Sequence, residues 1–86
     1  MSSKEQLTFL LGRHDPGQIF GENPDAPPDE YSSEAEEIFA RLQRGASERQ
    51  VREIVWEVFA AAVGHDEVDK NAIDRAARDI HRVLTS

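Results

Sequence analysis

The chain has no cysteine, and it has only one tryptophan, one tyrosine and one methionine among its 86 residues. Without cysteine the protein can form no disulfide, no thiolate-ligated zinc site and no thiol nucleophile. No apolar run approaches the roughly 18 residues that a membrane span needs, and no charged and then apolar signal segment opens the chain. We therefore expect one soluble domain, residues 1–86, located in the cytoplasm.

Grouped positive charge is also lacking. The sequence holds 10 Lys and Arg against 17 Asp and Glu, which gives a net charge of −7. Because phosphate binding needs clustered Lys and Arg, this composition disfavours nucleic acid as a partner. The acidic excess either attracts a basic protein and speeds its encounter, or serves solubility alone.

Period-two alternation typical of β-strands is missing as well, and apolar residues recur at helical spacing in four segments. Each segment follows a Ser or Asp that suits a helix start, and the first three end at Gly. The expected helices cover about residues 3–12, 33–44, 47–63 and a last segment from 66 or 69 onward.

Three Ser residues have the spacing of a capping box, Ser3 with Gln6, Ser33 with Glu36 and Ser47 with Gln50. The helix after Ser47 is the clearest of the four, because it is apolar over more than half of its circumference and carries Trp56 at the edge of that sector. We expect this third helix to be central and to contact neighbours on more than one side.

The pattern predicts an all-α fold: a small bundle of three main helices plus a shorter N-terminal helix. A long, acidic, Pro-rich loop is expected between the first and second helices. The short connections after Gly45 and around His65 predict that the second, third and fourth helices pack as antiparallel neighbours.

The segment from His14 to Glu37 is the most unusual part of the chain. It holds all four prolines and eight carboxylates, and it has no Lys or Arg. A loop of this length in a small domain is either functional or a packed strap. In the structural interpretation, Phe20 and Tyr31 fold back onto the Trp56 side of the third helix and cover its core.

In the functional interpretation, the same segment presents an acidic surface to another protein. Tyr31 would be the aromatic anchor, and the carboxylates would supply steering and specificity. The predicted protein-binding residues are Asp25, Asp29, Glu30, Tyr31, Glu34 and Glu37.

No group of residues indicates catalysis, so we expect no enzyme activity, no cofactor and no metal site. The histidines are not spaced as a helical metal-ligand pair, and we expect His14 and His65 to be solvated or capping residues. No serine is accompanied by a signalled base and orienting acid. A divalent ion held by His14, Asp15 and loop carboxylates is a weaker hypothesis.

The chain resembles a small bacterial helical family of unknown function, the YugE-like domains. The resemblance rests on HDPGQIF, on DAPPDEYSSEAEEI and on VWEVFAAAVG. It implies an all-helical bacterial protein and brings no activity or ligand, and His14 stands where an aromatic residue would be expected. The matching positions are Asp15, Pro16, Phe20, Pro28, Glu30, Tyr31, Glu34 and Phe59.

These observations favour a non-enzymatic module that binds another protein, with a basic protein as the expected partner and no nucleic acid or membrane. One alternative is an immunity-type inhibitor of a basic toxin, because nuclease-colicin immunity proteins are similar in size, acidity and helix number. The other is a homodimer that associates through the apolar face of the third helix, with the arginine row Arg75, Arg78 and Arg82 facing the acidic loop of a second copy.

Overall fold

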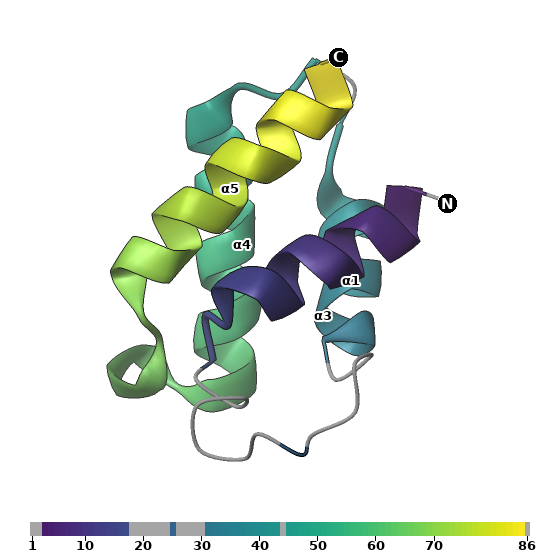
Figure 1. The fold of residues 1–86 in the computed structure, drawn as a ribbon. Helices are drawn as coiled ribbons and strands as arrows, with labels where there is room; N and C mark the ends of the chain where they lie inside the picture. The colour runs from purple at the N-terminus through teal and green to yellow at the C-terminus, as the bar shows by residue number, and fades with distance from the viewer. Residues whose placement is uncertain (1–2, 18–24, 26–30, 44, 86) are drawn as a thin grey trace.

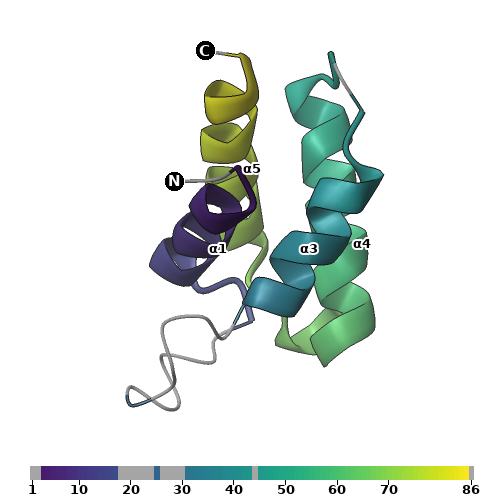
Figure 2. The ribbon, with the colours of Figure 1, turned by 90° about the vertical axis from the view of Figure 1, so that its right-hand side faces the viewer.

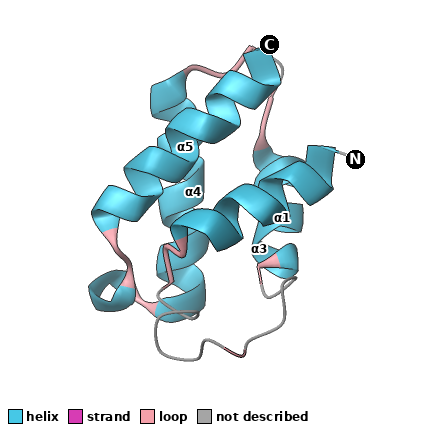
Figure 3. Cartoon of the chain, in the orientation of Figure 1, coloured by secondary structure: helices cyan, strands magenta, loops and turns pink. Residues whose placement is uncertain are grey.

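The computed structural model describes residues 3–17, 25, 31–43 and 45–85, and this part of the chain is helical throughout apart from turns and connections (Figure 1). The helices are α1 (Ser3–His14), α3 (Ser32–Arg41), α4 (Glu48–Val63) and α5 (Lys70–Thr85), and a short 3₁₀ turn, η1 (His65–Glu67), links α4 to α5. No strand occurs in these ranges (Figure 3), which confirms the all-α fold class.

The four helices lie in two layers, with α1 and α5 in one and α3 and α4 in the other (Figure 2). Contacts run around the bundle from α1 to α3, α3 to α4, α4 to α5 and α5 back to α1. Helix α4 runs antiparallel to both α3 and α5 (Figures 1 and 2), as the short connections predict. It therefore has neighbours on two sides, which agrees with its wide apolar sector.

The core lies between the two layers and is built from residues that recur every three or four positions. Ala76 and Ala77 on α5 are fully buried, so their small side chains let α5 approach its neighbours closely. The fully buried large side chains of the helices are Leu7, Leu11, Ile38, Val51, Val55, Phe59, Ile73 and Ile80.

Helix α1 is longer than the sequence suggests. Gly12 does not end it, since the helix continues to His14 and has 12 residues against 10 in α3. A glycine inside a helix costs only about 1 kcal/mol, which tertiary packing can offset. The N-terminal helix is therefore shorter than α4 and α5, which have 16 residues each, but it is not shorter than α3. The long connection that follows, with its prolines, lies mostly outside the described residues.

Of the three expected capping boxes, the one at Ser47 forms. Ser47 Oγ accepts a hydrogen bond from the Gln50 backbone N–H at 3.2 Å, and Gln50 Oε1 accepts one from the Ser47 N–H at 2.8 Å. The box at Ser33 is wrong, because Tyr31 is the N-cap of α3 and its carbonyl accepts from Ala35 N at 2.8 Å. Ser33 consequently lies inside the first turn.

The remaining helix boundaries agree in part with expectation. Gly64 ends α4 with a φ of +93°, and Asp69 Oδ1 caps α5 by accepting from the backbone N–H groups of Asn71 (3.0 Å) and Ala72 (3.2 Å). Gly45 also has a positive φ, +83°, but α3 ends earlier, at Arg41. The glycine therefore turns the connection between α3 and α4 and does not follow the helix directly.

The two serines give a matched test of these caps. Ser47→Ala removes a side-chain acceptor from the first turn of α4 and is expected to lower the free energy of unfolding by about 1 kcal/mol. Ser33→Ala removes no cap, so its effect should stay within about 0.5 kcal/mol. Urea unfolding followed by circular dichroism measures both, and equal losses would contradict the assignment of the α3 N-cap to Tyr31.

Candidate functional site

The predicted acidic contact residues are only partly within the described chain. Asp29 and Glu30 lie outside it. Asp25 and Glu37 are exposed, and Glu34 is half-buried in the first turn of α3. One carboxylate oxygen of Glu34, Oε2, is buried and has no hydrogen-bond partner among the described residues. The start of α3 therefore presents carboxylates, of which the Glu34 group has a buried oxygen with unused capacity to accept a hydrogen bond.

Tyr31 is fully buried, so it does not supply the exposed aromatic anchor that the functional interpretation assigned to it. Its ring packs edge to face on Phe59, with ring centroids 5.3 Å apart and an interplanar angle of 64°. The packing interpretation is thus confirmed for Tyr31. Phe20, its expected companion, lies outside the described residues.

The Tyr31 hydroxyl joins the start of α3 to the turn that follows α1. It donates to Asp15 Oδ1 and accepts from the Gly17 backbone N–H at 3.2 Å. Asp15 has a φ of +51°, a left-handed conformation that Asp adopts more readily than most residues. The buried Pro16 also holds this turn to the start of α5, because its carbonyl accepts from Asp69 N at 3.0 Å.

His14, the last residue of α1, is mostly buried and bonds to α5. Its Nε2 lies 2.7 Å from Asp79 Oδ2, and the two side chains are 13% and 24% exposed. The expectation of a solvated or capping His14 is therefore wrong, because packing of α1 on α5 removes this imidazole from water. The hydrogen bond to His14 lowers the pKa of Asp79, the positive charges of His14, Arg82 and Arg13 act in the same direction, and burial opposes them.

His65 is exposed and lies against Trp56, with ring centroids 5.8 Å apart. Within the described ranges, no group of three or more His, Cys, Asp or Glu residues is placed to hold a metal ion. The two protein ligands suggested for a divalent ion bond elsewhere, His14 to Asp79 and Asp15 to Tyr31. The loop carboxylates of that hypothesis lie largely outside the described chain.

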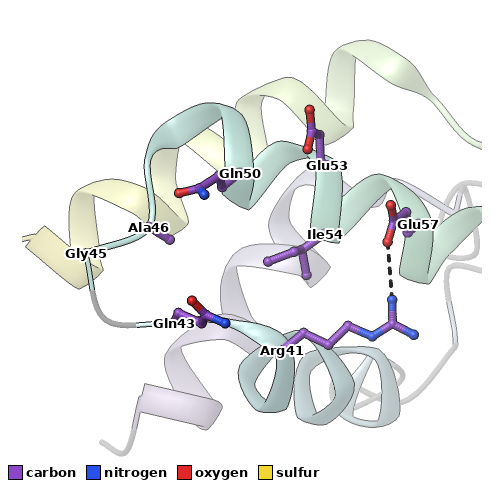
Figure 4. Close-up of a pocket in the computed structure, with 8 residues that line it drawn as sticks. All are labelled: Arg41, Gln43, Gly45, Ala46, Gln50, Glu53, Ile54 and Glu57. Carbon is purple, nitrogen blue, oxygen red and sulfur yellow. Dashed lines mark hydrogen bonds and ion pairs between the residues drawn. The ribbon is translucent and has the colours of Figure 1, made fainter.

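Two hollows lie along the seam between α3 and α4, and we call them together the α3–α4 groove. The larger, about 440 Å³, lies near the connection between the helices, and its eight lining residues are drawn in Figure 4. The smaller, about 190 Å³, lies at the start of α3 and is lined by Ser33, Glu34, Glu37, Val58, Ala61 and Ala62.

Arg41 connects the two hollows. Its Nη2 lies 2.7 Å from Glu37 Oε1 on the same helix, and its Nη1 lies 3.5 Å from Glu57 Oε2 on α4 (Figure 4). All three side chains are about half exposed, so these ion pairs contribute little to stability. Among the lining residues that the structure describes, Arg41 is the one cation, and Glu34, Glu37, Glu53 and Glu57 are the acids.

Sequence reasoning found the α3 side of this groove and missed the α4 side. Glu53 and Glu57 look like the solvated face of an amphipathic helix until α3 is placed beside them. The available signal was Ala61 and Ala62, small apolar residues that are exposed at the end of an otherwise well-buried stripe.

No family model, curated protein or solved structure matches the chain. The resemblance to YugE-like domains therefore stays a prediction, and the site is interpreted from its geometry alone. No helix in the described ranges combines the length and the apolar character needed to cross a membrane.

Removing the Tyr31 hydroxyl tests whether it fixes the turn after α1. Tyr31→Phe keeps the ring contact with Phe59 but leaves the Asp15 carboxylate and the Gly17 N–H without this partner. We expect the free energy of unfolding to fall by about 1–3 kcal/mol. Chemical denaturation measures it, and a change below about 0.5 kcal/mol would contradict the role assigned to the hydroxyl.

The His14–Asp79 pair predicts a pH dependence of stability. Because the pKa of Asp79 is lowered from its ordinary value of 3.8, the unfolded chain takes up the proton at a higher pH than the folded chain does. The stabilisation is complete above the ordinary pKa and is lost as pH falls through the folded value.

Asp79→Asn should therefore destabilise the protein by about 1 kcal/mol at pH 7, since the partners are partly exposed. The gap between variant and wild type should shrink towards zero well below pH 3.8. Urea unfolding of both proteins across this range measures it. A difference in the free energy of unfolding that stays constant with pH would show that the stabilisation does not come from the charge of Asp79.

Proposed function

We propose that the protein is a non-enzymatic, cytoplasmic interaction module that binds a basic protein through the acidic surface at the start of α3. The proposed contact residues are the carboxylates Asp25, Asp29, Glu30, Glu34 and Glu37. Tyr31 is buried and makes no contact with the partner in this proposal; it fixes the start of α3, the helix that carries Glu34 and Glu37.

The observation that carries the proposal is the state of Glu34. Leaving a buried acceptor without a donor costs about 1–3 kcal/mol in proteins generally. A Lys or Arg of the partner that donates to Glu34 Oε2 would remove this cost on binding. Asp25 and Glu37 are exposed and supply the long-range attraction.

The immunity-type alternative has the same physical basis, since an inhibitor of a basic toxin domain also needs an acidic surface on a small helical scaffold. The homodimer alternative has less surface to use. Val51, Val55, Val58 and Phe59, which form the apolar face of α4, are buried within a single chain. Light scattering at several concentrations separates these two, because an inhibitor of this kind needs no second copy.

Partner capture from the native host tests the proposal. The variant Asp25→Asn/Asp29→Asn/Glu30→Gln removes three charges from the acidic segment, and partner recovery is expected to fall about tenfold. Its matched control, Glu48→Gln/Asp66→Asn/Asp74→Asn, removes three exposed charges elsewhere and should recover the partner as the wild type does. Equal recovery by the two folded variants would refute this binding surface.

A further inference from the structure

The α3–α4 groove has the length and the lining of a binding site for one more helix. On α4 the lining positions advance by three or four residues, through Gln50, Ile54, Glu57 and Ala61, so they follow one face of the helix. The lining positions on α4, residues 50–62, span about 18 Å at 1.5 Å per residue. The seam would therefore be covered by an occupant of about three to four helical turns.

The floor of this groove is apolar and made of small side chains where it is most open. Ile54 is half-buried, Val58 is buried, and Ala61 and Ala62 are exposed. Small side chains allow another backbone to approach closely, and the branched ones offer apolar contact to a partner's side chains. A floor of this kind suits the apolar face of an amphipathic helix.

The walls are negative on both sides. Glu34 and Glu37 lie on α3. Glu53 and Glu57 lie on α4, with Arg41 paired to Glu57 across the seam (Figure 4). The described lining groups thus carry a formal excess of three negative charges. The buried Oε2 of Glu34 lies at one end of the groove, where no described residue donates a hydrogen bond to it.

We propose that the α3–α4 groove binds a basic amphipathic helix of about three to four turns, with its apolar residues on the alanine floor and its Lys and Arg residues beside the glutamate walls. This proposal rests on the proposed function and extends its surface from the start of α3 along the whole seam. The partner's recognition element is then a helix with an apolar face flanked by cationic residues, one of which lies near Glu34.

A pair of synthetic peptides provides the probe. The first is an 18-residue helix with a Leu/Ala face flanked by Lys and Arg, and the second carries Glu at every Lys and Arg position. Fluorescence anisotropy of the labelled peptides measures affinity. The first peptide is expected to bind the wild-type protein at least about tenfold more tightly than the second.

Two charge-reversal variants separate the groove from general attraction to an acidic protein. Glu53→Lys/Glu57→Lys changes the groove wall, and Glu48→Lys/Asp66→Lys makes the same change in net charge at exposed positions outside it. The wall variant is expected to weaken the first peptide about tenfold, and the outside variant no more than about twofold. Equal weakening by the two variants, or no binding to the wild type, would overturn the proposal.

The same variants show whether the inference or the proposed function has failed. If the Asp25/Asp29/Glu30 variant loses the host partner while the wall variant keeps it, the acidic segment is the binding surface and the groove proposal is wrong. If neither variant loses the partner and the peptide does not bind, both proposals are wrong. Circular dichroism of each variant confirms that it is folded.

Discussion

The hydroxyl of Tyr31 is the polar contact on which the arrangement of this bundle depends. It lies in the core and bonds to the turn after α1. The residue that carries it, Tyr31, is the N-cap of α3, so these bonds fix the place where α3 begins. The ring beneath it packs on Phe59 of α4. Through one side chain, α1, α3 and α4 are therefore held in a fixed relation, and the acidic surface inherits its position from that contact.

A buried aromatic residue directly below an exposed acidic surface has a simple physical advantage. The carboxylates of Glu34 and Glu37 stand on a helix whose first turn is fixed from inside, so they need little further ordering when a partner arrives. The same rigidity applies to the seam between α3 and α4. Charge on flexible segments gives steering, whereas charge on a fixed helix also gives orientation.

Helix locations could be predicted from the sequence because apolar periodicity and the Ser47–Gln50 box are local signals. The start of α3 could not, since the Ser33 pattern is equally local but the packing of Tyr31 decides the boundary. The His14–Asp79 pair joins residues 65 positions apart, which no spacing rule reaches. The groove was half predictable: the α3 acids stand out in the sequence, whereas Glu53 and Glu57 acquire meaning only once α3 lies beside α4.

That 65-residue separation has a consequence for the order of folding. The ring of helix contacts closes when α1 reaches α5, and the loop-closure entropy of this step is larger than for the neighbouring pairs α3–α4 and α4–α5. Contacts of such high sequence separation tend to form after the rate-limiting barrier. Weakening the His14–Asp79 pair would then speed unfolding and leave the folding rate nearly unchanged, which makes this pair a control on the lifetime of the native state.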